Sequence, residues 1–480
     1  MVKKWIPLTS MFLIVLALSI ATYIYSNPIK NDSLCGQQLG TAKIFKMQLP
    51  IVHFGAVTKY LLPKPEKFPN AIQVAKDGSA WFGEQSVPAI GHLYLNGTYV
   101  EYDWPINYSP STTAIWGIQL WNGGVWVTDA LGAQLVGLDP NSGQLAAVKL
   151  SNAASFPYTT AIAPDGSLWF TELYGDKIGR LSSTCQLSEY TIPTSYGGTP
   201  THIAFVNNTR GYYIDVGNAT SGIGALLSFN PTNFAPRPVT ANIDLYAPSG
   251  IAISQKTGTL WITQHGASSV ASYQPENQSW TLYPTSTITY ETTTLPYFDE
   301  TNGSLVWFNE HYANRMAVLN STERILTEYS LSNPPSSKII GIDNALTFAL
   351  GKDTAWFTEL TANYVGFVDA SFTPPYSIST KNQSITVKSG SAANVTVEVN
   401  GLSSIPLTVH FADSENITSE PQNIEFTSNA TDLPSLNGQE VLQIRVKTES
   451  NLLPGQYTVL ISVTNGLIYR GCYISLRVTS

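Results

Sequence analysis

The chain repeats one pattern of hydrophobic and polar positions along most of its length. In its clearest copy, DGSLWFTE at Asp165–Glu172, a turn dipeptide precedes an apolar, aromatic run that ends at a carboxylate. Asp-Gly and Asn-Gly dipeptides favour tight hairpin turns, and aromatic residues favour strands. The pattern therefore predicts a hairpin whose second strand ends at a polar residue.

Seven copies of this pattern occur, and each ends at a polar side chain. The final residues are Glu84, Asp129, Glu172, Asp215, Gln264, Glu310 and Glu359. The differences between consecutive numbers in this series are 45, 43, 43, 49, 46 and 49. A period in the forties, with room for four short strands in each unit, is typical of a β-propeller.

The seventh copy lacks a fourth strand after YVGFVD at Tyr364–Asp369. The segment VTKYLLP at Val57–Pro63 has the character of that missing strand and precedes the first copy. A strand from the N-terminal side that completes the last blade would remove a free sheet edge. The repeat thus predicts an all-β, seven-bladed propeller over residues 57–371, closed by its N-terminal strand.

The remainder of the chain predicts two further segments. After Pro374-Pro375 the sequence changes to six or seven short alternating strands, which favour an immunoglobulin-like β-sandwich over residues 376–480. At the other end, Trp5–Tyr25 is an uncharged stretch of 21 residues preceded by Lys3-Lys4. Residues 1–30 are therefore expected to form a transmembrane anchor, and a cleaved signal peptide is the alternative.

Composition favours a location outside the cytoplasm. Only 12% of residues are charged, the net charge is −8, and no basic run occurs, so nucleic-acid binding is not expected. Asn-x-Ser/Thr sequons are spread from Asn31 to Asn429, as in a glycoprotein of the cell surface. Of the three cysteines, Cys35 and Cys185 either form a disulfide or remain separate thiols, and both possibilities stay open.

The seven final polar residues are expected to form a ring at the channel mouth, because each ends a strand beside the innermost strand of its blade. Six of them are acids: Glu84, Asp129, Glu172, Asp215, Glu310 and Glu359. Such a ring could bind Mg²⁺ or Ca²⁺, or its members could have raised pKa values. The equally weighted alternative is that these acids bond to backbone amides of neighbouring blades and tie the ring together.

Two groups of aromatic and imidazole side chains are candidates for chemistry on the same face. His265 and His311 directly follow the ring position in adjacent blades, so they could act as a base or as metal ligands. The simpler interpretation is that both are exposed at strand ends. Candidate ligand-binding residues at the channel mouth are Trp116, Trp121, Tyr158 and His202.

The repeat resembles that of the virginiamycin B lyase (streptogramin lyase) family, most closely at Asp165–Arg180 and again at Trp356–Glu359. The resemblance implies a seven-bladed propeller that opens a cyclic lactone by elimination. It also implies a divalent metal held partly by a Glu of the Trp-Phe-Thr-Glu type, and a histidine base from Pro-His-Gly motifs. No such motif is present, and His202 in Pro200-Thr201-His202 stands one residue late, so it is expected to point to the other face of its strand.

These observations lead to three hypotheses. The favoured one is a membrane-anchored, extracytoplasmic surface protein whose propeller mouth binds a small molecule, a glycan or a surface protein. The alternative is a metal-dependent lyase or lactonase that acts on a cyclic ester. A third is a purely structural block. The first and third are favoured over the enzyme because the catalytic histidines of the family are not matched and because fold does not fix function.

Overall fold

The computed structural model describes residues 34–105, 111–217, 222–286, 303–332, 345–415 and 423–480, together with the backbone of residues 297–299. Every regular element in these parts is a strand, as an all-β fold requires. Within them, no helix has the length and apolar character needed to cross a bilayer. The predicted anchor at residues 1–30 lies outside the described residues.

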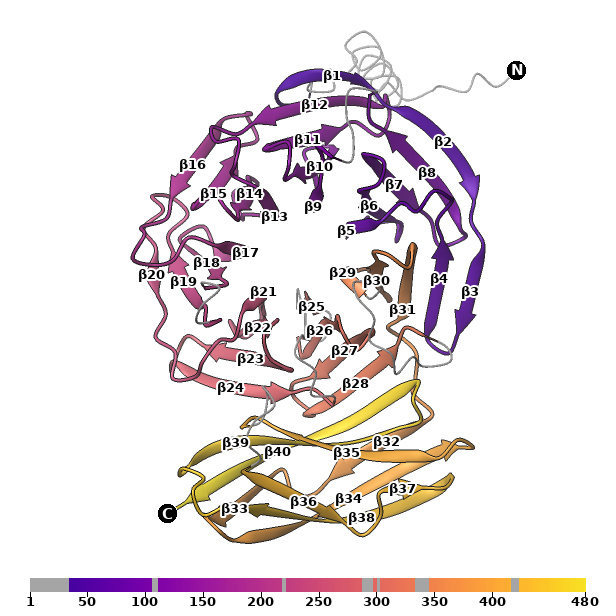
Figure 1. Cartoon of the computed structure of the whole chain (residues 1–480), viewed down its shortest axis with the longest axis vertical. Helices are drawn as coiled ribbons and strands as arrows, with labels where there is room; N and C mark the ends of the chain where they lie inside the picture. Colours follow the sequence, from indigo (N-terminus) through magenta and orange to yellow (C-terminus); the bar gives the residue numbers. More distant parts are fainter. Residues whose placement is uncertain are drawn as a thin grey trace, which may run out of the picture.

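Seven antiparallel sheets surround a central channel (Figure 1), which confirms the propeller-like architecture. Listed from the innermost strand outward, the first four blades are β5 (Pro69–Val74), β6 (Ala80–Glu84), β7 (Ala89–Leu93) and β8 (Thr98–Asp103); β9 (Ile115–Trp121), β10 (Gly124–Asp129), β11 (Gln134–Leu138) and β12 (Gln144–Lys149); β13 (Pro157–Ile162), β14 (Leu168–Glu172), β15 (Lys177–Leu181) and β16 (Leu187–Thr191); and β17 (Pro200–Asn207), β18 (Arg210–Asp215), β19 (Ala225–Phe229) and β20 (Arg237–Pro238).

The last three blades follow the same order and close the ring. They are β21 (Pro248–Ile253), β22 (Leu260–Gln264), β23 (Ser269–Gln274) and β24 (Ser279–Pro284); β25 (Tyr297–Asp299), β26 (Leu305–Glu310), β27 (Arg315–Asn320) and β28 (Ile325–Ser330); and β29 (Ala345–Leu350), β30 (Thr354–Glu359), β31 (Tyr364–Asp369) and β4 (Val57–Leu61). Strand β4 pairs with β31. This pairing is the ring closure that the repeat predicts.

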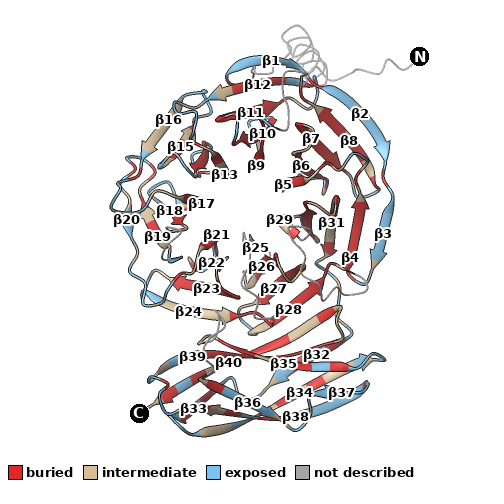
Figure 2. Ribbon diagram, viewed as in Figure 1, coloured by how far each residue is buried: buried red, intermediate tan, exposed pale blue. Residues whose placement is uncertain are grey.

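Aromatic side chains of the second strands hold neighbouring blades together. Trp169 of blade three is fully buried and contacts Phe205 and Phe229 of blade four. Burial of large aromatic rings of this kind contributes strongly to packing between sheets. Figure 2 shows that the inner strands are mostly buried, whereas the outer strands β16 and β24 are mostly of intermediate burial and β20 is exposed.

An N-terminal belt, residues 37–54, wraps around the outside of three blades. Its strands β1 (Gln37–Thr41), β2 (Lys43–Gln48) and β3 (Ile51–Phe54) add a fifth strand to blades two, one and seven (Figure 1). A disulfide joins Cys35, just before the belt, to Cys185 in the turn between β15 and β16 of blade three. Of the two possibilities that the sequence leaves open, the disulfide is the one present, and Cys472 remains a free, buried thiol.

The C-terminal segment forms two sheets that face each other. One contains β32 (Tyr376–Thr380), β34 (Ala392–Ser403), β38 (Leu436–Thr448) and β36 (Ile424–Ser428). The other contains β33 (Ser384–Lys388), β40 (Ile468–Thr479), β39 (Gly455–Thr464), β35 (Leu407–Asp413) and β37 (Asp432–Leu433), with β33 parallel to β40. The arrangement is a β-sandwich, and its immunoglobulin-like character stays a prediction.

The sandwich is joined to the propeller through a shared sheet. Strand β40 pairs with β28, the outermost strand of blade six, so one sheet runs from the channel into the sandwich. A single hydrophobic cluster includes Trp307 and Tyr329 of blade six together with Val459 and Ile474 of the sandwich. The sequence predicts two separate domains, but their cores are continuous.

Candidate functional site

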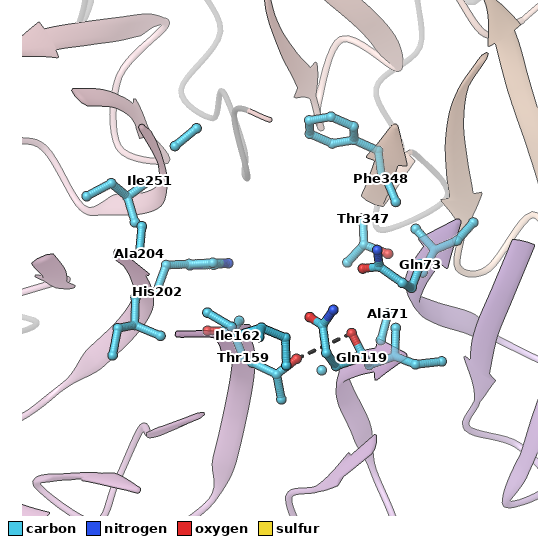
Figure 3. Close-up of a pocket in the computed structure, with 18 of the residues that line it drawn as sticks. Ala71, Gln73, Gln119, Thr159, Ile162, His202, Ala204, Ile251, Thr347 and Phe348 are labelled. Atoms are coloured by element: carbon cyan, nitrogen blue, oxygen red, sulfur yellow. Dashed lines mark hydrogen bonds between the residues drawn. The ribbon is translucent and has the colours of Figure 1, made fainter. Parts of the chain in front are cut away.

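A cavity of about 580 Å³ occupies the central channel (Figure 3). Its described wall comes from the innermost strands of blades one to five and seven. This wall contains no Asp, Glu, Lys or Arg side chain, and His202 is its one titratable residue. The volume lies within the range of about 300–1,000 Å³ that is typical of small-molecule pockets. The described part of the channel wall is therefore electrically neutral and forms a candidate site.

A β-bulge at the start of the innermost strand in blades one to five and seven determines which side chains enter the channel. In blade four, Pro200 pairs with Asp215 and Ile203 pairs with Tyr213, so that Thr201 and His202 stand opposite a single residue. A bulge of this kind redirects the side chains that follow it. His202 consequently lines the channel and points into it (Figure 3). The expectation that a one-residue offset turns His202 to the other face is wrong, because that expectation assumes regular pairing.

His202 is the one large side chain at its level among the blades whose innermost side chains are described. The corresponding residue, two positions after the partner of the final polar residue, is Ala71, Gly117, Thr159, Gly250 and Thr347 in the other blades. His202 is only 5% exposed. Burial lowers its pKa to about 3, although the backbone of Ser249 opposes the shift. His202 is therefore a neutral imidazole in the channel wall.

Three aromatic rings from adjacent blades form an arc where the innermost strands begin. The Trp116 and Tyr158 ring centroids are 5.3 Å apart, and the Tyr158 and His202 centroids are 6.0 Å apart in a T-shaped arrangement. Trp116 lines the channel and is partly exposed. Burial raises the pKa of Tyr158 to about 12, so its hydroxyl stays protonated at neutral pH. The arc can offer apolar ring surface to a ligand.

Two carboxamides, which sequence reasoning missed, lie at a second level of the channel. Gln73 and Gln119 each pair with the first aromatic residue of the neighbouring strand, Trp81 and Trp126. At the same register the other described blades have alanine: Ala161, Ala204, Ala252 and Ala349. Aligning the repeats on their aromatic pair would have revealed these two polar exceptions.

Trp121 does not belong to the channel. It ends β9 at the far end from Trp116, is 7% exposed, and packs edge-on against Trp126 with 5.5 Å between ring centroids. Its indole N–H donates a 2.7 Å hydrogen bond to the Gly166 carbonyl of blade three. The prediction of Trp121 as a ligand platform is wrong, because the length of β9 carries it away from the mouth and into the packing between two blades.

The predicted ring of acids does not face the channel. All seven final polar residues are at most 2% exposed, and none of them lines the cavity: Glu84, Asp129, Glu172, Asp215, Gln264, Glu310 and Glu359. The expectation that these side chains face the channel is wrong, because a residue at the end of the strand next to the innermost one can still direct its side chain between the blades.

Three of these residues bind the loop that enters the innermost strand. Asp129 accepts hydrogen bonds from the backbone N–H of Ala114 and from the Gln134 carboxamide, at 3.2 and 2.7 Å. Asp215 accepts from the backbone N–H groups of Thr199 and Gly217, both at 2.9 Å. Gln264 accepts from the Tyr246 N–H at 2.8 Å. These contacts fit the alternative only in part, because the backbone donors belong to the residue's own blade or to the loop that enters it, not to a neighbouring blade.

Three of the glutamates lie beside a buried basic side chain. Lys67 lies 3.6 Å from Glu84, Arg315 lies 3.6 Å from Glu310, and Lys59 forms an ion pair with Glu359. Burial raises the pKa of Glu84 to about 8 and that of Glu310 well above its usual range. Glu172 has no such partner, and burial raises its pKa to about 7.

The described residues do not fit a divalent metal. Nowhere in residues 34–105 or the other described segments do three or more His, Cys, Asp or Glu side chains gather as possible ligands. The acids with basic neighbours already have a compensating cation, as the pair of Glu310 and Arg315 illustrates. Mg²⁺ or Ca²⁺ binding stays an untested prediction that this geometry does not support.

The two candidate catalytic histidines are close to each other but outside the cavity wall. The His265 and His311 rings lie 6.4 Å apart between centroids, and His311 Nδ1 is 3.3 Å from the Ala345 carbonyl oxygen. Burial lowers the pKa of His265 to about 4 and also lowers that of His311. His311 is buried, and His265 is partly exposed, so neither is the fully exposed strand-end residue of the simpler interpretation.

Comparison with known proteins gives one family match and several solved propellers. Residues 55–352 match the model of the Virginiamycin B lyase family. Selenomethionine-substituted virginiamycin B lyase from Staphylococcus aureus is 19% identical, with 68% of this chain and 99% of that chain covered and a TM-score of 0.54. A catalytically inactive variant of that lyase with quinupristin is also 19% identical, with 68% of this chain and 99% of that chain covered and a TM-score of 0.55. A streptogramin B lyase is 20% identical, with 65% of this chain and 97% of that chain covered and a TM-score of 0.54.

At these identities the likeness to solved structures concerns the fold alone. A search of curated proteins finds no match.

Proposed function

The chain belongs to the virginiamycin B lyase family, and within that family we propose that it is a membrane-anchored, extracytoplasmic protein whose propeller channel binds an uncharged small molecule. The observation that carries this proposal is the neutral, partly aromatic character of the described channel wall. An unpaired charge is costly to bury, and the described wall offers a charged ligand no ionic partner. Uncharged ligands are therefore favoured.

Two features support a location outside the cytoplasm. The Cys35–Cys185 disulfide suits an oxidising compartment, because cytosolic thiols are kept reduced. The uncharged stretch within residues 1–30 would place the folded chain on the outer side of a membrane, with Lys3 and Lys4 on the inner side.

A second candidate function is a lyase or lactonase that acts on a cyclic ester, and the contact between His265 and His311 favours it. In an elimination, a base removes a proton next to the carbonyl while the ester C–O bond breaks. A histidine with a pKa near 4 is neutral at pH 7 but is a weak base, which lowers its efficiency in this step. The ligand-binding proposal is therefore preferred.

Two dyes with one aromatic skeleton test the preferred function. The full-length protein in detergent is titrated with neutral N-phenyl-1-naphthylamine and with its anionic counterpart 1-anilinonaphthalene-8-sulfonate, and dye fluorescence is followed. We expect the neutral dye to bind more tightly, and Trp116→Ala to weaken its binding at least tenfold. Trp280→Ala, on the outer strand β24, is the matched control.

Equal binding of both dyes, or an equal effect of the two tryptophan variants, would contradict the proposal. The enzymatic alternative is tested separately by incubating the protein with quinupristin and separating the ring-opened isomer by chromatography. Ring opening that is lost in His265→Ala and His311→Ala would favour the lyase instead.

A further inference from the structure

Two carboxamides and an imidazole line the channel from three different blades. Figure 3 shows His202 pointing into the cavity from blade four, with Gln73 of blade one across from it and Gln119 of blade two between them along the wall. From this arrangement, and resting on the binding role proposed above, we infer that the ligand is a neutral saccharide whose hydroxyls are bound by these three side chains.

The carboxamide pair is the first support for this ligand class. Gln73 and Gln119 come from adjacent blades at the same register and are partly exposed to the channel. Neither side chain has a hydrogen-bond partner among the described residues. Each carboxamide offers one acceptor oxygen and two N–H donors. Two such groups side by side can bind neighbouring hydroxyls, which both donate and accept.

His202 supplies matching groups on the opposite wall. A neutral imidazole presents one donor and one acceptor nitrogen. His202 is buried, and since the Ser249 backbone can pair with one ring nitrogen at most, at least one nitrogen lacks a partner within the described chain. Leaving buried polar atoms without hydrogen bonds costs free energy, so a ligand that pairs with them is favoured. Such a ligand needs hydroxyls on two opposite edges, as a pyranose ring has.

The aromatic arc provides the apolar half of saccharide recognition. A sugar ring has C–H groups on its faces, and these can lie against the electron-rich face of an aromatic ring. Trp116 lines the channel, and Tyr158 lies beside it at 5.3 Å between centroids. The described wall has no cation for an acidic sugar and no carboxylate for an amino sugar. Both types should be rejected in favour of neutral sugars.

Binding of saccharides to the full-length protein tests the inference. Neutral gluco-, manno-, galacto- and N-acetylglucosamine oligosaccharides are compared with uronic-acid and sialylated oligosaccharides on an array, and the hits are measured by calorimetry. We expect only neutral sugars to bind, and the double variant Gln73→Leu/Gln119→Leu to raise Kd at least tenfold. The matched control is Gln274→Leu, because Gln274 bonds to Thr259 outside the channel wall.

The outcomes separate this inference from the function on which it rests. If neutral N-phenyl-1-naphthylamine binds through Trp116 but no neutral saccharide binds, the saccharide inference is refuted and the binding role survives. If neither binds, both are refuted. Binding of acidic sugars with equal affinity would also overturn the inference. So would an unchanged Kd in the Gln73→Leu/Gln119→Leu variant that still folds, as judged by circular dichroism.

Discussion

Replacing Glu172 with Gln should stabilise the protein at neutral and alkaline pH. Its carboxyl group is buried, with the residue fully inaccessible to solvent. Burial raises its pKa from 4.5 to about 7, and Ser155 and Lys177 oppose this shift only in part. The folded state therefore holds a proton that the unfolded state releases above pH 4.5.

The size of the effect follows from this difference in pKa. The raised pKa contributes stability that is fully present below pH 4.5 and is lost as the pH rises through 7. Each unit of pKa corresponds to about 1.4 kcal/mol, so the folded state loses about 3 kcal/mol between these limits. Gln does not titrate. The Glu172→Gln variant should match the wild type near pH 4.5 and exceed its stability by up to about 3 kcal/mol at pH 8.

The chain contains its own control for this substitution. Blade five has Gln264 at the corresponding position, where its carboxamide accepts from Tyr246 N–H and donates to Ser269 Oγ at 2.7 Å. A glutamine therefore fits this site in the fold. The reverse change, Gln264→Glu, should destabilise the protein at pH 8 and have less effect at pH 4.5.

Urea unfolding of both variants and the wild type at pH 4.5 and pH 8 measures these differences. The reasoning is refuted if Glu172→Gln and the wild type show the same change in unfolding free energy between the two pH values. It is also refuted if Gln264→Glu gains stability at pH 8. Either result would mean that the buried carboxyl is compensated within the folded protein.

Three further predictions concern contacts outside the channel. Removing the disulfide with Cys35→Ala/Cys185→Ala, which opens a crosslink spanning 150 residues, should lower the unfolding free energy by up to about 5 kcal/mol; the urea midpoint of the variant should no longer respond to reductant. Arg315→Met leaves two buried glutamates without their cation and should lower the free energy of unfolding by about 3–5 kcal/mol. A thiol reagent should then label the buried Cys472 thiol faster than in the wild type. Trp121→Ala should lower the free energy of unfolding, measured by urea titration, by about 3–5 kcal/mol and should leave dye binding in the channel unchanged.

The sequence predicts the blades well because each repeat carries its own local signals. The turn and aromatic run of Asp165–Glu172 specify a hairpin without reference to the rest of the chain, and the strand forms at Leu168–Glu172. The belt at residues 37–54 was missed for the opposite reason. Its strands lie on exposed edges, so burial imposes no clear alternation on them, and their pairing with three distant blades leaves no local signal.

The site was harder to predict because side-chain direction depends on register. His202 enters the channel only because a bulge interrupts pairing after Pro200. The acids are expected to face the channel, but Asp129 and Asp215 instead accept hydrogen bonds from backbone N–H groups in the loops that enter the innermost strands. The repeat predicts where each residue lies along its strand. The direction of its side chain depends on how that strand pairs with its neighbour, which the sequence alone does not show.

The closure of the ring also explains how opposite walls of the channel keep a fixed separation. The belt covers the outer edges of blades one, two and seven, and β40 covers that of blade six. Covered edges resist both fraying and pairing with other chains. Gln73 and Gln119 belong to the belted blades, whereas His202 stands on blade four, whose outer strand β20 has two residues. A ligand that spans the channel must match a distance set by the whole ring, and a rigid ring lowers the entropic cost of binding it.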